Sequence, residues 1–317
     1  MPADSGIAEA ASVLRTGGLV AFPTETVYGL GANALDARAV ARVFEAKARP
    51  SFDPLITHLA EAAELEKLVG AVPAAVAALA ERFWPGPLTL IVDRPAVIPP
   101  IVTSGLQTMA VRVPDHEAAR ALIAAAGVPV AAPSANRFGQ LSPTRAEHVV
   151  RGLGAAVDVV LDGGSTRCGI ESTIVDVRGD RPVVLRLGAL PVEALEEAVG
   201  PVSVRSGSSG QPVAPGTLAA HYAPRTPLRL AAGAEPAAGE GARRGFLAFR
   251  ERPSGDWAAV EVLSGRGDLT EAAARLFDAL HRLDGTGVDE IVVEPVPDVG
   301  VGRAINDRLR RAAATWR

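Results

Sequence analysis

The segment from Ser203 to Gly216 constrains the fold more than any other feature of the chain. It is rich in serine, glycine and proline and has no hydrophobic periodicity, which is typical of a linker. The chain has 317 residues, which is long for one domain and comfortable for two. We therefore expect a large domain over residues 1–200, a linker over residues 201–226 and a small domain over residues 227–317.

Short apolar runs before the linker predict buried strands, and amphipathic stretches predict helices. Leu19–Phe22 and Val128–Ala132 have the length of strands, whereas Asp36–Lys47 has the pattern of a helix with Asp36 as its N-cap. The predicted strands and helices do not alternate strictly along the chain. This order favours a twisted, open, mixed α/β sheet over a doubly wound parallel sheet.

The residues after the linker predict a second, smaller α/β domain. Pro227–Leu230, Gly245–Phe249 and Ile291–Val293 resemble strands, and Leu269–Leu283 is a clear amphipathic helix. The chain contains no internal repeat and no heptad array.

Composition argues against several functional classes. A formal net charge of -4 does not indicate a surface that grips nucleic acid, although a local basic patch stays open. The single cysteine, Cys168, excludes an internal disulfide and fits a reducing compartment. The first residues carry no basic signal, and the apolar stretches are well below the ~20 residues that span a bilayer. We expect a cytoplasmic protein that does not enter a membrane.

Polar residues follow the first predicted strand directly. Thr24, Glu25, Thr26 and Tyr28 lie in the stretch from Phe22 to Gly31, at a strand end of the kind where binding groups collect. The alternative is an ordinary exit from the strand, with Tyr28 in the core.

Two cations end the helix predicted over Asp36–Lys47. Lys47 and Arg49 are followed by Pro50, and such cations also stabilise a helix C-terminus without any ligand. Lys47 is one of only two lysines in the chain, so its compact amine could be needed here. Together the two side chains are suited to a polyphosphate, and His58 lies a short strand away.

Two arginines occupy apolar strands. Arg112 follows Met109-Ala-Val111, and Arg186 lies in Leu185-Arg-Leu187. A guanidinium there is costly to bury without an anion. For Arg112 the partner is either a ligand carboxylate or an acidic side chain of the protein.

Small and hydroxyl residues follow the strand over Val128–Ala132. Ser134 and Asn136 offer hydrogen bonds beside it, and Ser142 and Thr144 precede a helix whose N-terminus could bind phosphate. Helix capping alone would also explain Ser142 or Thr144.

The end of the linker is unusual for a linker. The stretch from Ala214 to Pro224 concentrates proline, glycine, His221 and Tyr222, which is typical of a lid that folds over a pocket. The sequence lacks a P-loop, a G-x-G-x-x-G after a strand, a zinc-binding spacing and a nucleophile elbow. Any nucleotide is therefore held by a non-standard site.

Ten of these segments, in this order, resemble the YrdC-like threonylcarbamoyl-AMP synthases in their long two-domain form. They extend from about Gly18 to Pro224, and the likeness of the second domain is weaker. The segments are PTETVYGLG, KARPSFDPLITH, WPGPLT, MAVRVP, PVAAPSAN, SPT, DGG, GIESTIVD, LRLG and APGTLAAHYAP.

The resemblance implies an enzyme with a twisted, open, mixed α/β fold and a large cavity. It would join L-threonine, bicarbonate or CO2 and ATP into threonylcarbamoyl-AMP, a nucleotidyl transfer that releases pyrophosphate. A separate threonylcarbamoyl-transfer complex would use the product to modify tRNA, so stable direct binding of nucleic acid is not expected. Mg²⁺ is implied as the partner of ATP, bound through phosphates and not by a cage of protein ligands.

The resemblance also implies site residues. The threonine site would consist of Thr24, His58, Arg112, Ala132 and Ser172. The nucleotide site would consist of Lys47, Arg49, Ser51, Thr108, Ser134, Asn136, Ser142, Arg186 and Tyr222. Lys47 and Arg49 would stabilise the charge that develops on the phosphoryl oxygens, and His221 and Tyr222 would form the lid. Asp53 and Ala214 depart from the family, which usually has asparagine and serine there.

Three rival functions stay open at this point. An RNA-binding module of the same fold would show salt-dependent binding without threonine-dependent ATP turnover. A carbamoyl-transfer enzyme of the hydrogenase-maturation type would carry acylphosphatase and zinc-finger segments, which the sequence lacks. A scaffold protein would use the second domain as a partner surface.

Overall fold

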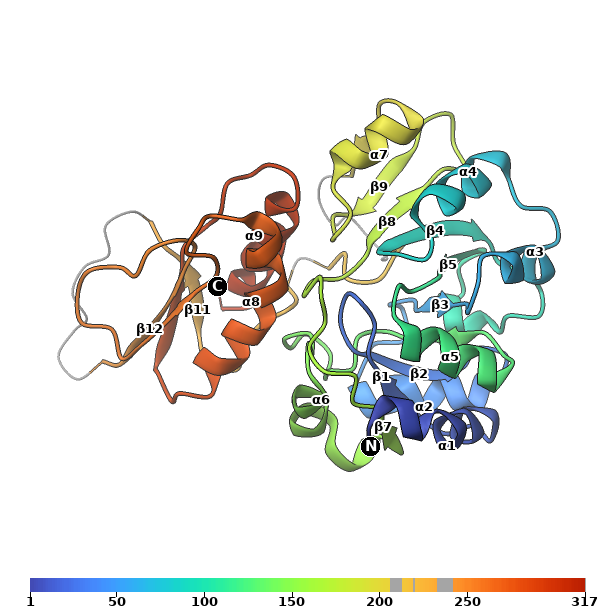
Figure 1. The fold of residues 1–317 in the computed structure, drawn as a ribbon, viewed down its shortest axis with the longest axis horizontal. Coiled ribbons are helices and arrows are strands. Elements are labelled where there is room, and N and C mark those ends of the chain that lie inside the picture. The colour runs from blue at the N-terminus through green and yellow to red at the C-terminus, as the bar shows by residue number, and fades with distance from the viewer. Residues whose placement is uncertain (206–212, 219, 233–241, 317) are drawn as a thin grey trace.

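The computed structural model describes residues 1–205, 213–218, 220–232 and 242–316, which form two α/β units (Figure 1). The larger unit contains one ten-stranded mixed sheet in the order β10-β9-β8-β4-β5-β3-β6-β2-β1-β7. Its strands are β1 (Val20–Phe22), β2 (Gly29–Asn33), β3 (Ile56–His58), β4 (Leu88–Asp93), β5 (Thr108–Arg112), β6 (Val130–Ala131), β7 (Val159–Val160), β8 (Thr173–Asp176), β9 (Val183–Arg186) and β10 (Ser203–Val204). The predicted mixed sheet is confirmed.

Helices pack around this sheet and close its apolar core. They are α1 (Ala3–Arg15), α2 (Ala37–Lys47), α3 (Ala63–Val69), α4 (Ala74–Phe83), α5 (Glu117–Ala126), α6 (Ala146–Leu153) and α7 (Val192–Val199), with short 3-10 turns at Pro100–Thr103 and Gly154–Ala156. No helix in the described part of the chain is both long and apolar enough to cross a membrane.

The smaller unit is built on four parallel strands in the order β11-β14-β12-β13. Its elements are β11 (Leu228–Leu230), β12 (Arg244–Ala248), β13 (Ala259–Val262), α8 (Leu269–Asp284), β14 (Glu290–Val293) and α9 (Gly302–Ala314). The predicted second α/β domain is thus present, with β13 and α9 in addition to the elements expected from the sequence.

Helix α2 begins and ends where its sequence dictates. The side chain of Asp36 accepts hydrogen bonds from the backbone N–H groups of Arg38 and Ala39, at 2.8 and 3.3 Å. The helix stops at Ala48, which adopts a left-handed conformation with a φ of 50°. This sharp end sends Lys47 and Arg49 toward the interior of the larger unit, where both are buried.

The register of β3 and β5 places four side chains on one face of the sheet. Ile56 pairs with Ala110 and His58 pairs with Arg112, and alternate residues of a strand point to the same side. Ile56 and Ala110 belong to an apolar cluster that also contains Ala214 of the linker. The linker therefore lies across this face of the sheet.

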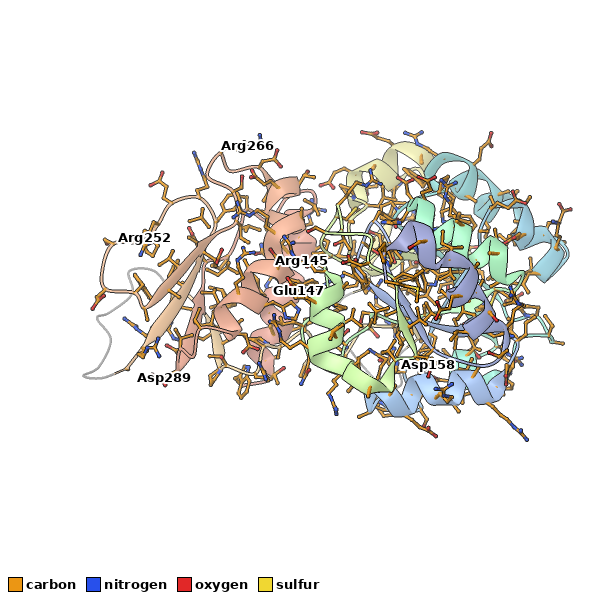
Figure 2. All side chains as sticks on the ribbon, turned by 60° about the horizontal axis from the view of Figure 1, so that its bottom comes forward. Arg145, Glu147, Asp158, Arg252, Arg266 and Asp289 are labelled. Atoms are coloured by element: carbon orange, nitrogen blue, oxygen red, sulfur yellow. The ribbon has the colours of Figure 1, made fainter. Side chains whose placement is uncertain are left out.

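The two units share an apolar interface. Helices α8 and α9 lie between their own sheet and the larger unit (Figure 1). Their core cluster includes Val27, Leu141, Ile170 and Tyr222, all outside the smaller unit. At the edge of the interface Arg145 donates to Asp278 of α8 at 3.0 Å, and Figure 2 shows Arg145 at this junction.

Candidate active site

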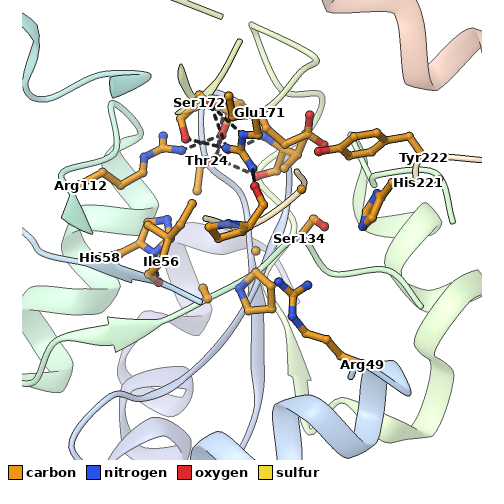
Figure 3. A pocket seen from close by; sticks show the side chains of 18 residues that line it. Thr24, Arg49, Ile56, His58, Arg112, Ser134, Glu171, Ser172, His221 and Tyr222 are labelled. Carbon is orange, nitrogen blue, oxygen red and sulfur yellow. Dashed lines mark hydrogen bonds between the residues drawn. The ribbon is translucent and has the colours of Figure 1, made fainter. Parts of the chain in front are cut away.

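A cavity lies on the sheet face that carries His58 and Arg112 (Figure 3). Its walls come from the loop after β1, the ends of α2, β3, β5 and β9, the loop after β6, the residues before β8 and the linker. The lining residues are Thr24, Thr26, Val27, Gly29, Arg49, Ile56, His58, Arg112, Ala132, Pro133, Ser134, Glu171, Ser172, Arg186, Pro215, Gly216, His221 and Tyr222.

One end of the cavity is formed by Arg112. Its guanidinium donates to the carboxylate of Glu25 at 2.6 Å and to the hydroxyl of Thr26 at 3.1 Å. Its Nε is buried without a hydrogen-bond partner among the described residues. Beside it, burial and the charge of Arg112 lower the pKa of His58 to about 3, so this imidazole is neutral at physiological pH.

Arg49 lies on the opposite side of the cavity (Figure 3). It forms an ion pair with Asp53 at 2.9 Å and donates to the backbone carbonyls of Asp53 and Pro54 at 3.0 and 2.9 Å. Burial lowers the pKa of the Arg49 guanidinium and the Asp53 carboxylate opposes that change. A guanidinium nevertheless stays charged in such a setting, so this end of the cavity is cationic.

Lys47 supports the cavity from behind its wall. Its ammonium donates to the carbonyl of Ser134 at 2.6 Å and to the carbonyl of Asn136, and only 1% of the residue is exposed. Burial lowers the pKa of Lys47 well below its usual value. The amine therefore fixes the loop after β6, which presents Ser134 to the cavity.

Arg186 is the least compensated cation of the cavity. Its guanidinium donates to the carbonyl of Ser172 at 2.8 and 3.2 Å and to the carbonyl of Pro215 at 3.1 Å. No carboxylate in the described ranges lies within ion-pair distance of it. Burial lowers its pKa, and an anionic ligand would reverse that effect.

The end of the linker is seated over the cavity. Tyr222 is 2% exposed and His221 is 4% exposed, and both side chains line the cavity. The ring of His221 meets those of Tyr222 and Phe138 edge-on, with centroids at 4.2 and 5.5 Å. The linker residues Pro215, Gly216, His221 and Tyr222 thus form part of the cavity wall.

Comparison with known proteins identifies the family and the fold. Residues 12–188 match a family described as "Telomere recombination" (Sua5, YciO and YrdC), and residues 190–314 match "Threonylcarbamoyl-AMP synthase, C-terminal domain". The threonylcarbamoyl-AMP synthase of Bacillus subtilis is 45% identical over 98% of this chain and 93% of its own length. The chain belongs to the threonylcarbamoyl-AMP synthase family.

Archaeal members of the threonylcarbamoyl-AMP synthase family are similarly close. The Pyrococcus abyssi enzyme is 44% identical over 96% of this chain and 93% of its own length. The structure of P. abyssi Sua5 complexed with L-threonine matches with a TM-score of 0.91 and 41% identity, covering 99% of this chain and 95% of that chain. The two-domain architecture is therefore shared over nearly the whole chain.

The structure brings most of the residues expected from the threonylcarbamoyl-AMP synthases into one cavity. These are Thr24, Arg49, His58, Arg112, Ala132, Ser134, Ser172, Arg186, His221 and Tyr222. Five other expected residues, Lys47, Ser51, Thr108, Asn136 and Ser142, lie outside the lining.

Each of these five residues has a different position. Lys47 and Asn136 stabilise the loop after β6, and the Asn136 amide donates to the carbonyls of Arg137 and Gln140 at 2.8 and 2.9 Å. Ser142 donates to Glu171 at 2.5 Å. Ser51 is exposed after α2, and Thr108 begins β5, the strand that Arg112 ends. Their roles toward a nucleotide stay predictions.

Sequence reasoning did not assign roles to three polar residues of the site. Glu25 and Thr26 bind the guanidinium of Arg112, and Glu171 lines the cavity. The signal for Glu25 was the buried Arg112 itself, which requires an anion. Glu171 lies two residues before β8, and its partner Arg308 is 137 residues away, so no local sequence signal marks it.

The carboxylates at the cavity are engaged by arginines. Glu171, which lines the cavity, accepts from Arg308 of α9 at 2.9 Å, and Glu25 binds Arg112. The lining thus presents guanidinium groups whose charge suits an anionic ligand. Within the described residues, no group of three histidine, cysteine, aspartate or glutamate side chains could hold a metal ion.

Proposed function

We propose that this enzyme makes threonylcarbamoyl-AMP and pyrophosphate from L-threonine, bicarbonate or CO2, and ATP. The observation that carries the proposal is one cavity with guanidinium groups at opposite ends, Arg112 at one and Arg49 at the other. An amino-acid carboxylate and a triphosphate are the two anions that such a cavity would hold side by side. The relative complexed with L-threonine supports the choice of amino acid.

Threonine is placed at the Arg112 end. Its carboxylate would take the free Nε of Arg112 and share the guanidinium with Glu25. The Ser172 hydroxyl, now bonded to Thr89 at 2.8 Å, and the neutral ring of His58 complete the polar wall around the substrate. These residues hold the amine toward the centre of the cavity.

ATP is placed at the Arg49 end. Arg49 and Arg186 supply two buried positive charges, and Ser134 lies on the loop that Lys47 fixes. A phosphate next to Arg186 would give this guanidinium the anionic partner that the described residues do not provide. Ser51, Thr108, Asn136 and Ser142 belong to the same proposed nucleotide site as outer members.

The chemistry needs positioning and charge, and no covalent nucleophile. The threonine amine attacks CO2, or bicarbonate with loss of water, to give N-carboxythreonine. Its new carboxylate attacks the α-phosphorus of ATP, and pyrophosphate leaves as the bond to the β-phosphate breaks. Negative charge builds on the phosphoryl oxygens, where Arg49 and Arg186 stabilise it with Lys47 behind them. The lid formed by His221 and Tyr222 excludes water from an intermediate that hydrolyses easily.

The nucleotide is expected to enter as its Mg²⁺ complex. Glu171, which lines the cavity, and Glu25, which lies behind Arg112, already bind arginines, so the residues present fit a metal carried by the phosphates and by water. The product would pass to a separate threonylcarbamoyl-transfer complex that modifies tRNA. We place these steps in the cytoplasm.

Mass spectrometry of the product tests the proposal. Incubation with L-threonine, ATP, Mg²⁺ and carbon-labelled bicarbonate should give threonylcarbamoyl-AMP that carries the label, with much less product from L-serine. Arg112→Ala should raise the KM for threonine far more than the KM for ATP, because one end of the cavity is lost. AMP formation that does not depend on threonine would contradict the proposed function.

A further inference from the structure

An arginine of the smaller unit is buried behind the cavity wall. Arg308 of α9 is 1% exposed, and its Nε donates to Glu171 at 2.9 Å while a terminal amine donates to Asp307 at 2.9 Å. Burial alone would lower the pKa of Arg308. The nearby Tyr222, Glu171 and Asp307 raise it by more than burial lowers it, so the pKa of Arg308 lies above its usual value. A buried guanidinium of this kind is retained only where its partners compensate the loss of water.

Glu171 links Arg308 to the cavity. It lines the cavity on the larger unit, and its second carboxylate oxygen accepts from the hydroxyl of Ser142 at 2.5 Å. The contact between Arg308 and Glu171 therefore crosses from one unit to the other. This hydrogen bond holds the Glu171 carboxylate on the same side of the cavity as Tyr222 (Figure 3).

Tyr222 needs external support to stay over the cavity. Its backbone has a φ of 63°, a left-handed conformation that costs a residue with a side chain about 1 kcal/mol or more. The guanidinium carbon of Arg308 lies 5.0 Å from the ring centre of Tyr222, and the ring of Phe277 from α8 lies 5.8 Å away. A cation against an aromatic face is attractive, especially when both are desolvated.

The same helix also holds the backbone of the lid. Arg311 donates to the carbonyl of Leu218, and the N–H of His221 donates to the carbonyl of Arg311 at 3.3 Å. The lid thus contacts α9 at Leu218 and at His221, on the N-terminal side of Tyr222.

We propose that Arg308 is a positioning residue for catalysis: it clamps Tyr222 and Glu171 together, so that the C-terminal domain holds the lid closed. The inference rests on the proposed function, because closure is what protects the adenylate from water. Arg308 itself lies behind these two side chains and does not line the cavity. The C-terminal domain is on this view a part of the active site.

Two variants of Arg308 test the clamp in the full-length enzyme. Arg308→Met removes the charge, and Arg308→Lys keeps the charge but loses the planar group that lies against the Tyr222 ring. Arg310→Met is the matched control on the same helix, because the Arg310 side chain is 59% exposed. Threonylcarbamoyl-AMP formation, AMP release and amide hydrogen exchange at His221 and Ala223 are measured for each.

We expect Arg308→Met to lower kcat about 10- to 100-fold and to raise the share of ATP that ends as free AMP. The amides of His221 and Ala223 should exchange at least ~10-fold faster, because lid opening becomes easier. Arg308→Lys should fall between Arg308→Met and wild type. Arg310→Met should match wild type in all three measurements.

A double-mutant cycle separates positioning from a merely structural role. If Arg308 acts through the lid, adding Arg308→Met to Tyr222→Leu should change kcat less than ~2-fold, because the clamped ring is already gone. Additive effects on kcat, or unchanged amide exchange in Arg308→Met, would overturn the clamp. Wild-type enzyme without threonylcarbamoyl-AMP formation would sink the proposed function instead, and amide exchange would still test the clamp.

Discussion

Lys47→Met is the most informative single substitution, because the structure gives Lys47 a supporting role behind the cavity. The ammonium holds the carbonyls of Ser134 and Asn136, and methionine fills a similar volume without a donor. Each buried carbonyl left without a partner costs about 1–3 kcal/mol. The Ser134 carbonyl also accepts from the backbone N–H of Asn136 at 3.0 Å, so one carbonyl, that of Asn136, loses its partner. The predicted loss is therefore about 1–3 kcal/mol, a sizeable share of the ~5–15 kcal/mol that stabilises a domain.

Denaturant unfolding and threonine-dependent exchange between ATP and pyrophosphate measure this prediction. The exchange rate should fall on the order of 10²-fold or more, because the loop that carries Ser134 and the nearby charge are both disturbed. Lys67→Met is the control, since Lys67 is the other lysine of the chain and is exposed on α3. It should change stability by less than ~0.5 kcal/mol.

The outcome separates two readings of Lys47. Unfolding free energy within ~0.5 kcal/mol of wild type would refute the argument that this amine holds the loop. A near-wild-type exchange rate would remove Lys47 from the mechanism. Lost stability with intact exchange would leave Lys47 as a purely structural residue.

Three further predictions follow from local geometry. Gly216→Ala should lower the rate of product formation and cost about 1–2 kcal/mol of stability, because its φ is 71° and a Cβ would lie 2.3 Å from the Tyr222 hydroxyl. Asp36→Ala should cost about 0.5–2 kcal/mol in denaturant unfolding and leave activity unchanged, because it removes the N-cap of α2. Burial lowers the pKa of His148 to about 3 and that of His281 to about 4, so unfolding takes up protons below the usual histidine value of ~6.5. The free energy of unfolding should therefore be fully present above pH ~6.5 and fall as pH drops, by up to about 1.4 kcal/mol per pH unit for each histidine. His281→Asn should reduce the slope of the unfolding free energy against pH by up to about 1.4 kcal/mol per pH unit, the share of one histidine. An unchanged slope would contradict a lowered pKa of His281.

Local sequence signals predicted most elements of the larger unit. The helix over Asp36–Lys47 was visible because an N-cap and an apolar face occur together, and both are present in α2. Strand β2 was missed, because Gly29-Leu-Gly-Ala-Asn33 contains no β-branched residue and two glycines. A Cβ at Gly31 would lie 2.8 Å from both Phe22 and Val130, so close packing between strands explains the glycine.

Helix α9 was missed for a different reason. Its buried face contains Asn306 and Arg308, which a hydrophobic pattern counts as exposed positions. Their partners lie outside the helix: Asn306 bonds both backbone groups of Val296, ten residues earlier, and Arg308 binds Glu171 of the larger unit. A hydrophobic pattern along the helix does not contain these partners.

Family motifs predicted most of the residues that line the cavity. They did not predict ion pairs between residues that lie far apart in the sequence. The sequence left open whether Arg112 faces a ligand or an acid of the protein, and the structure shows Glu25 in that place. In the proposed ligand role of Arg112, a substrate carboxylate and Glu25 therefore share one guanidinium, because the substrate joins an ion pair that is already formed. The pair with Glu25 keeps the Arg112 guanidinium from being buried without an anion.

The same reasoning accounts for a second domain in an enzyme whose cavity, among the described residues, is lined by the larger unit and the linker. A lid that excludes water must bring backbone and polar side chains into a dry site, and each such group needs a partner. Within the described part of the linker, the Thr217 hydroxyl donates to the Ala214 carbonyl at 2.9 Å. Tyr222 is held in a left-handed conformation and has partners outside the linker. Helix α9 provides them through Arg308 and Arg311, so closure of the lid and docking of the C-terminal domain are one physical event.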